Sequence, residues 1–264
     1  MTADYEYRGL LAKAWDLLRG DYSTWPDRPF YCEIIQRQAG PALDVGCGAG
    51  RLILDYLAAG LDVDGVDNSP EKLALCRDKA AASGVAVEGR LFLQEMDQLD
   101  LPRKYGVIFV PSLSFQLVLD PAAAAAAMRR FHDHLAPGGV LVMSLKSRLW
   151  ENRPTPPQMQ WSPWFKLAEK EREDGDTIRR FIHEMYDHDQ QLQHEENRYE
   201  VLRDGEVIEA EFHSRCPCVR WYSQAQALAL FERAGFGDVK MTAAESAHPA
   251  TPEDNSVKIR GTRL

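Results

Sequence analysis

The amino-acid sequence predicts an α/β fold, in which a doubly wound and mostly parallel β-sheet carries an inserted antiparallel β segment. Across residues 1–145, short apolar runs alternate with helical patterns, which is typical of βαβ units. One of these runs leads directly into a glycine-rich turn at residues 46–50. Residues 146–218 break the alternation, because Trp and Pro cluster there and strand patterns follow. Together these observations indicate a parallel α/β core that is interrupted by an insertion.

The elements of the expected parallel part follow one another closely. Helical patterns predict helices at residues 10–18, 30–39 and 51–59, from Ser69-Pro70, and from Asp120-Pro121 to the turn at residues 137–139. Apolar runs predict strands at residues 42–45, 61–66, 87–93, 107–110 and 140–145. Ser69 supplies a capping hydroxyl and Pro70 occupies the first helical position, which is a common helix start.

The expected insertion has two parts. Residues 146–175 are rich in Trp, Pro and charge, and residues 177–211 predict two or three antiparallel strands with a hairpin turn at Asp204-Gly205. A helix at residues 224–234 and strands near Val239 and at residues 257–259 close the chain. We therefore expect a core of residues 1–145 plus 219–264, and an insertion at residues 146–218 that acts as a substrate cap or a dimer contact.

Charge and cysteine content narrow the class of protein. The 264 residues contain 31 Lys and Arg against 40 Asp and Glu, so the net charge is −9 and nucleic-acid binding is disfavoured. The N-terminal residues do not have the pattern of a secretory signal, and no apolar run is long enough to span a membrane. The odd number of cysteines, without a pattern, predicts reduced thiols in a cytoplasmic protein.

The glycine-rich turn is the most informative segment. Its spacing is G-x-G-x-G, whereas a dinucleotide site prefers G-x-G-x-x-G, and Arg51 stands where that pattern has its third glycine. Asp44 lies two residues before the first glycine, at the end of the expected strand. A carboxylate there suits a ligand with an ammonium group and would repel a diphosphate. Asp67 ends the next strand, where a carboxylate can accept hydrogen bonds from both hydroxyls of a ribose. The competing interpretation is a bare Rossmann turn with a solvated acid.

In these residues the chain resembles the class I S-adenosylmethionine (SAM)-dependent methyltransferases. The matching segments are residues 43–51, 63–70, 94–96 and 134–139, and residues 220–223 and 234–236 resemble the borders of the family's last helix. The resemblance implies that Asp44 and the backbone of Gly46, Cys47, Gly48 and Gly50 hold the methionine part of SAM. It also implies that Asp67 binds the ribose, that Asn68, Glu95 and Met96 surround the adenine, and that Pro111 completes the cofactor site.

Two positions depart from the family's pattern. Glu95 stands where relatives usually carry Asp. Its side chain is longer, so its contact with the adenine amino group should differ from that of the usual Asp. Gly106 stands where many relatives carry Asp before the fourth strand, and we expect this change to affect loop packing more than chemistry.

Residues on the substrate side are expected at two places. Ser112, Ser114 and Gln116 follow the fourth strand, next to the expected methyl group, where they either contact the substrate or are simply solvated. Tyr22 and Trp25 either form a lid over the ligand or pack in the core. The aromatic residues of the insertion present the same choice between a substrate wall and ordinary packing: Trp150, Trp161, Trp164 and Phe165.

No metal site is predicted, because the seven His residues lack metal spacing and Cys216-Pro217-Cys218 has no second pair.

The resemblance implies an enzyme that transfers a methyl group from SAM to a nitrogen or oxygen nucleophile of a small molecule by direct displacement, leaving S-adenosylhomocysteine. The sequence identifies no catalytic base and does not separate a monomer from a homodimer. A methyltransferase acting on protein or tRNA, a SAM-binding interaction protein without catalysis, and a nicotinamide-dependent oxidoreductase are the alternatives.

Overall fold

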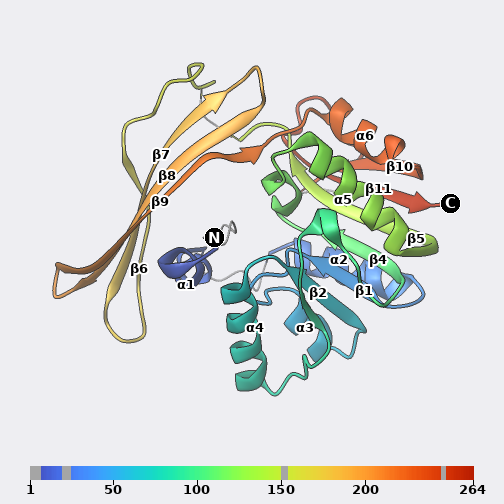
Figure 1. The fold of residues 1–264 in the computed structure, drawn as a ribbon, viewed down its shortest axis with the longest axis horizontal. Helices are drawn as coiled ribbons and strands as arrows, with labels where there is room; N and C mark the ends of the chain where they lie inside the picture. The colour runs from blue at the N-terminus through green and yellow to red at the C-terminus, as the bar shows by residue number, and fades with distance from the viewer. Residues whose placement is uncertain (1–6, 20–24, 150–153, 245–247) are drawn as a thin grey trace. The chain divides into compact units, whose positions relative to one another are not determined.

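The structure is a computed structural model and describes residues 7–19, 25–149, 154–244 and 248–264. The chain divides into two compact units, each built on its own β-sheet. The core unit consists of Ser23–Leu149 and Trp221–Leu264, and the antiparallel unit consists of Met1–Tyr22 and Trp150–Arg220 (Figure 1).

The core unit contains a seven-stranded sheet in the order β10-β11-β5-β4-β1-β2-β3. Strands β1 to β5 run parallel, whereas β11 at one edge pairs antiparallel with both β5 and β10. Because β1 pairs with both β2 and β4, the strand order reverses beside β1, and ligands of such sheets bind at the carboxyl ends of the strands at this point. The strands are β1 (Ala42–Val45), β2 (Val63–Asp67), β3 (Leu91–Leu93), β4 (Tyr105–Val110), β5 (Leu135–Lys146), β10 (Phe236–Ala243) and β11 (Ser256–Arg263).

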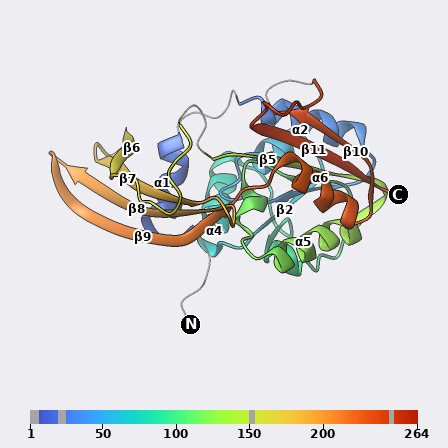
Figure 2. The same ribbon diagram turned by 90° about the horizontal axis from the view of Figure 1, so that it is seen from above.

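Helices cover both faces of the core sheet (Figure 2). One face packs against α2 (Asp27–Arg37), α3 (Ile53–Ala58) and α4 (Pro70–Ser83), and the other packs against α5 (Pro121–His134) and α6 (Gln224–Arg233). Successive strand side chains point to opposite faces, so Leu43 and Val45 join the cluster under α5 and α6 while Ala42 joins the cluster under α2. Two short 3-10 helices, η1 (Met96–Gln98) and η2 (Ser114–Leu117), lie near the carboxyl ends of β3 and β4. The doubly wound, mostly parallel sheet predicted from the sequence is confirmed.

The antiparallel unit is a four-stranded sheet in the order β6-β7-β8-β9. Its strands are β6 (Phe165–Glu171), β7 (Thr177–Asp187), β8 (Leu192–Arg203) and β9 (Glu206–Arg220), and the turn between β8 and β9 is at Asp204-Gly205 as predicted. The sequence predicted two or three strands here. The additional strand, β6, begins at Phe165 inside the Trp- and Pro-rich stretch, whose composition concealed it.

The first helix, α1 (Gly9–Arg19), belongs to the antiparallel unit, which corrects its expected place in the core of residues 1–145. Leu10 and Ala14 of this helix pack with Tyr199 and Val201 of β8 in one buried cluster. The carboxylate of Glu211 on β9 accepts a hydrogen bond from the backbone N–H of Leu10 at 2.7 Å and so satisfies an open donor at the helix start. These contacts join segments about 200 residues apart, which no local pattern reveals.

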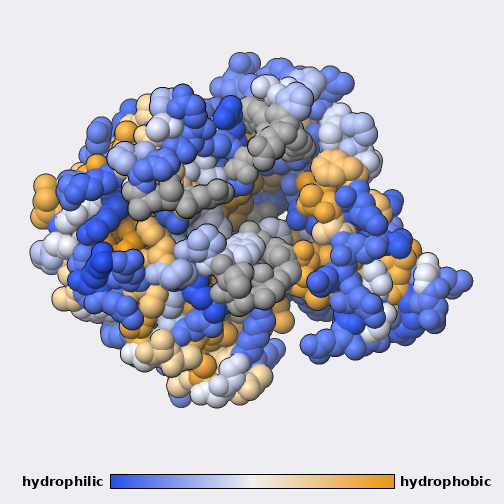
Figure 3. Space-filling model, turned by 180° about the vertical axis from the view of Figure 1, so that it is seen from behind, coloured by the Kyte–Doolittle hydropathy of each residue, from blue (hydrophilic) through white to orange (hydrophobic). Residues whose placement is uncertain are grey.

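The expected strand at residues 87–93 is reduced to Leu91–Leu93, because a turn with Gly89 at φ +69° precedes it. On the face of the molecule drawn in Figure 3, hydrophobic residues lie in patches among hydrophilic ones. Most of the large hydrophobic side chains that are exposed belong to the antiparallel unit: Met159, Trp164, Leu167, Val207, Ile208 and Phe212.

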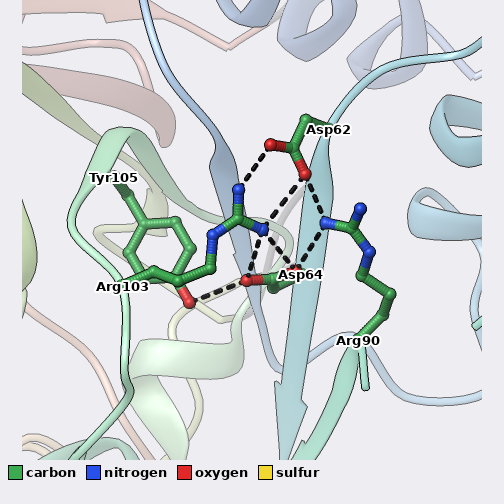
Figure 4. Close-up of polar contacts among 5 residues, drawn as sticks. All are labelled: Asp62, Asp64, Arg90, Arg103 and Tyr105. Atoms are coloured by element: carbon green, nitrogen blue, oxygen red, sulfur yellow. Dashed lines mark hydrogen bonds and ion pairs between the residues drawn. The ribbon is translucent and has the colours of Figure 1, made fainter. Parts of the chain in front are cut away.

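A network of charges holds the amino ends of β2 and β4 together (Figure 4). The buried carboxylate of Asp64 accepts hydrogen bonds from Arg90 at 3.0 Å, from Arg103 at 3.1 Å and from the hydroxyl of Tyr105 at 3.0 Å. Asp62 pairs with the same two guanidinium groups from the solvent side. The network lies at the opposite end of β2 from Asp67, so it supports the sheet and not the expected site.

We predict that Asp64→Ala lowers the free energy of unfolding by about 2–4 kcal/mol, because it leaves the buried hydroxyl of Tyr105 without its acceptor and removes the buried carboxylate from two guanidinium groups, which then have only Asp62. Asp62→Ala is the matched control, since the Asp62 side chain is 47% exposed and its loss should cost under about 1 kcal/mol. Urea denaturation of both variants measures the difference. Equal losses in the two variants would contradict the assignment of Asp64 as the centre of the network.

Candidate functional site

The glycine turn after β1 is tied to the end of β2 by its backbone. The N–H groups of Gly46 and Cys47 both donate to the carbonyl oxygen of Val66, at 2.8 Å and 3.1 Å. The N–H of Gly48 donates to the carboxylate of Asp67 at 2.8 Å. The turn and Asp67 are therefore brought together at the carboxyl edge of the sheet, as the sequence predicted.

Two of the three glycines leave no room for a side chain. Gly46 has a φ of +75°, and a Cβ atom there would lie 2.6 Å from Oγ of Ser114. A Cβ atom at Gly50 would lie 2.7 Å from Sγ of Cys76. At Gly48, by contrast, a Cβ atom would meet nothing within 4 Å, so one side of the turn is open to an approaching ligand.

Cys47 lies within the turn but its thiol faces the protein. Its Sγ atom lies 2.9 Å from the position of a Cβ atom on Gly65, and its side chain belongs to the cluster beneath α2 and α3. Burial, followed by the charges of Asp67 and Asp44, raises the pKa of the Cys47 thiol well above its usual value. Cys47 therefore contributes its backbone to the site and not a thiolate.

Asp44 is the most unusual group at this edge. Its side chain is only 1% exposed, and its Oδ1 atom has no hydrogen-bond partner among the described residues. The pKa of Asp44 is raised to about 8, chiefly by burial; the nearby guanidinium of Arg51 opposes the rise, and the charges of Asp67 and Asp27 contribute to it. A buried carboxylate oxygen without a partner is costly, and a cationic or hydrogen-bond-donating ligand would relieve that cost.

Arg51 lies next to the turn and is held from two sides. Its guanidinium donates two hydrogen bonds to the carboxylate of Asp27, at 2.9 Å and 2.6 Å, and lies 5.3 Å from the centre of the Trp25 ring. Trp25 is therefore engaged with Arg51 at the start of α2. Tyr22, its expected partner in a lid, lies outside the described residues.

Asp67 and its neighbours form the second half of the site. The Asp67 carboxylate accepts the N–H groups of Gly48 and Ser69, which partly offset the rise in its pKa that burial causes. The side-chain amide of Asn68 donates to both oxygens of Glu95, at 3.2 Å and 3.0 Å. Met96 starts η1 and packs against the core. The structure thus brings Asn68 and Glu95 together, and the longer carboxylate at position 95 reaches its partner.

The segment after β4 contains the strained residue of the site. Pro111 is buried, and Ser112 adopts a φ of +58°, a region that residues other than glycine seldom occupy. Ser114 packs against the glycine turn at Gly46. Gln116 differs from its expected place on the substrate side, because its buried amide exchanges two hydrogen bonds with the backbone of Lys146, at 2.7 Å and 3.0 Å. It therefore fastens η2 to the end of β5.

Comparison with known proteins agrees with this geometry. Residues 42–139 match a family described as a methyltransferase domain, a span that includes the glycine turn, Asp67 and the segment after β4. The chain is 30% identical over 148 residues to the ubiquinone biosynthesis O-methyltransferase of Pseudomonas paraeruginosa, and the match covers 54% of this chain and 62% of that protein. Residues 42–139 therefore form a methyltransferase domain. Because the match spans about six tenths of the curated relative, it does not extend to that protein's whole activity.

Solved structures share the methyltransferase fold over nearly the whole chain. A SAM-dependent methyltransferase from Clostridium acetobutylicum has a TM-score of 0.73 at 18% identity, with 92% of each chain covered. The sugar N-methyltransferase KedS8 from Streptoalloteichus sp. has a TM-score of 0.70 at 19% identity, covering 100% of this chain and 96% of that one. At these identities the likeness establishes the fold alone, and it includes the antiparallel unit.

Sequence reasoning missed the acid that holds Arg51. Asp27 lies 24 residues before Arg51, and no motif links the two positions.

Among the described residues, no group of three or more His, Cys, Asp or Glu side chains is arranged to hold a metal ion. Within the same residues, no helix is long and apolar enough to cross a membrane.

We predict that Asp44→Asn stabilises the protein without ligand, and increasingly so as the pH rises. The folded-state pKa of about 8 lies above the ordinary value of 3.8, so the folded protein keeps a proton that the unfolded chain loses. The contribution of Asp44 to stability is therefore full below about pH 4 and declines as the pH rises toward 8. The variant's advantage in unfolding free energy should grow by at least about 1 kcal/mol between pH 5 and pH 8.

Chemical denaturation at several pH values measures this effect. Asp62→Asn is the control whose difference from wild type should stay constant between pH 5 and pH 8, because Arg103 lowers the pKa of Asp62 and this carboxyl is ionised in both the folded and the unfolded state over that range. If the difference in unfolding free energy between Asp44→Asn and wild type stays constant from pH 5 to pH 8, Asp44 is ionised in the folded protein at neutral pH. That result would contradict the raised pKa assigned to Asp44.

Proposed function

We propose that this protein transfers a methyl group from SAM to a nitrogen or oxygen nucleophile of a small molecule. The observation that carries the proposal is the buried Asp44 carboxylate, whose Oδ1 atom has no partner among the described residues and lies beside the glycine turn. SAM has an ammonium group on its methionine part, which is the kind of donor that this oxygen lacks. A dinucleotide would instead bring a diphosphate toward the acids Asp67 and Asp27, whose negative charges would repel it.

The other residues of the edge fit the remaining parts of SAM. Asp67, at the end of β2, is placed to accept hydrogen bonds from ribose hydroxyls, since its ionised carboxylate has more acceptor sites than its two backbone donors fill. The open side of Gly48 allows the ligand to approach the backbone closely. Asn68 and Glu95 would present their polar atoms to the adenine edge, and Met96 would contact the ring.

SAM, when bound, supplies a methyl group on a positively charged sulfur, so the reaction is a direct displacement with a neutral leaving group. The protein's contribution is mainly to align the nucleophile with that methyl group, and such alignment can lower a barrier by roughly 7–11 kcal/mol. Ser112 and Ser114 are the substrate-side residues that remain once Gln116 is committed to β5. The strained backbone of Ser112 fixes the direction of this segment.

The acceptor class is supported by two kinds of relative. The curated relatives are named as O-methyltransferases of ubiquinone biosynthesis, and they align with about half of this chain. The sugar N-methyltransferase structure covers the whole of it. We therefore propose an amino or hydroxyl group of a sugar-like small molecule. An amine that binds in its neutral form needs little help from a base.

A thermal-shift titration with SAM, S-adenosylhomocysteine and NAD tests the cofactor. A ligand at about 100 times its dissociation constant adds about 2.7 kcal/mol to the stability of the folded state. SAM and S-adenosylhomocysteine should raise the unfolding temperature, whereas NAD should not. The absence of a shift with SAM would overturn the proposal before any acceptor is tested.

We predict that Asp67→Ala raises the dissociation constant for SAM by about 10- to 100-fold, because it removes charge-assisted hydrogen bonds to the ribose. Titration calorimetry measures the change. Asp62→Ala, at the other end of the same strand, serves as the control and should bind SAM as wild type does. Unchanged affinity in Asp67→Ala would show that the ribose lies elsewhere.

We also predict that the affinity for SAM rises with pH between pH 5 and 7. The ammonium group binds to ionised Asp44, and the pKa of that carboxyl is about 8 in the protein without ligand. Each pH unit should therefore increase the affinity by up to about tenfold. Asp44→Asn should bind SAM more weakly and with an affinity that does not change over this range, and the same slope in both proteins would refute the role of Asp44.

A further inference from the structure

One face of the antiparallel sheet contains a row of polar side chains from three adjacent strands. His183 of β7 pairs in register with Glu196 of β8, which pairs with Ser214 of β9. The imidazole Nε2 of His183 lies 2.8 Å from Oε2 of Glu196, and the hydroxyl of Ser214 donates to Oε1 of the same carboxylate at 3.1 Å. Glu196 therefore fixes the orientation of the imidazole.

Two indole rings enclose this imidazole. The ring centres of Trp161 and Trp164 lie 4.3 Å and 4.0 Å from that of His183, at interplanar angles of 22° and 17°. Two rings that are both so close and so nearly parallel to the imidazole must occupy its opposite faces. His183 therefore holds Trp164 by stacking, while Trp164 itself stays 45% exposed.

The backbone before β6 restricts Trp164 further. The N–H of Ser162 donates to the carbonyl oxygen of Glu184 at 2.9 Å, and the N–H of Glu184 donates to the hydroxyl of Ser162 at 3.1 Å. The backbone N–H of Met159 also donates to the carbonyl oxygen of Tyr186 at 2.9 Å. The segment that contains Trp161 and Trp164 is thus fastened along β7, so the exposed indole is rigid as well as accessible.

Phe212 extends the exposed aromatic surface. It is 58% exposed, and its ring centre lies 6.2 Å from that of Trp164 at an angle of 53°. Arg198, directly opposite Phe212 in register, places its guanidinium 4.8 Å from the ring of Phe181. Tyr199 and Val201, which alternate with these residues along β8, point to the other face and pack against α1. The aromatic residues of this face therefore do not form the unit's core.

We infer that Trp164 and Phe212, which we call the aromatic platform, bind a pyranose ring of the acceptor. A pyranose has an apolar face of C–H groups, which suits an exposed indole, and an edge of hydroxyl groups, which suits Glu196, Ser214 and Arg198. Each of these polar groups has a partner within the sheet, Arg198 with Glu200 at 3.0 Å, and each can make further hydrogen bonds to sugar hydroxyls, which a flat aromatic ligand would not offer. Large exposed apolar rings among polar groups are typical of recognition sites. The inference rests on the proposed function, since it names the substrate class.

Saturation-transfer NMR with methyl β-D-glucosaminide tests the platform. We expect transfer from the wild-type protein to the C–H protons of one ring face. The transfer should fall at least fivefold in Trp164→Ala and be largely retained in Trp164→Phe, which keeps an aromatic ring. Leu167→Ala is the matched control, because Leu167 is 47% exposed on β6 and lies outside the platform. It should behave as wild type does.

Two further measurements separate the possible failures. SAM binding, measured by thermal shift in the same samples, should be equal in wild type and the three variants. If wild type did not bind SAM, the result would count against the proposed function and not against the platform. para-Nitrophenol should bind more weakly than para-nitrophenyl β-D-glucosaminide. Equal binding of these two compounds, or equal transfer from Trp164→Ala and wild type, would overturn the inference.

Discussion

The carboxylate of Asp44 is the group on which the arrangement of the site depends. It lies at the end of β1, next to the point where the strand order reverses, and parallel strands at the centre of a sheet are buried on both faces. An acid in such a strand is expensive to bury, and Arg51 offsets this only in part. Burial of Asp44 therefore lowers the stability of the folded protein at the carboxyl edge of the sheet, and the two large apolar clusters of the core offset this loss.

Several features around Asp44 follow from this burial. Arg51 lies close enough to lower the pKa of Asp44 by its charge, and its guanidinium donates two hydrogen bonds to Asp27. The glycine turn supplies backbone where side chains would block access, and Gly48 is the position at which that access is open. The ion network around Asp64 lies at the amino end of β2 and anchors the strand there, where no ligand is expected. The carboxyl end of β2, where the ligand is expected, is left free for binding.

The sequence was sufficient for the features that local chemistry determines. The glycine turn, the acids at the ends of β1 and β2, and the caps of α4 and α5 all depend on neighbouring residues, and the structure contains each of them. The contacts that escaped prediction join distant positions. Gln116 reaches the backbone of β5, and Glu211 caps a helix about 200 residues earlier in the chain. Such pairings depend on strand register and packing, which one sequence without an alignment does not reveal.

The two sheets treat their polar side chains in opposite ways. In the core unit, a buried oxygen of Asp44 is left without a partner in the described part of the chain, and an unsatisfied group of this kind is explained best by a ligand that completes it. In the antiparallel unit, His183 and Glu196 are joined to each other and to Ser214, so their effect is to hold other groups still. A fully paired network that immobilises an exposed indole points to recognition of a ring, just as an unpaired carboxylate points to recognition of a charge. In the function and the platform that we propose, binding of the methyl donor therefore rests on electrostatics, and binding of the acceptor rests on a rigid surface.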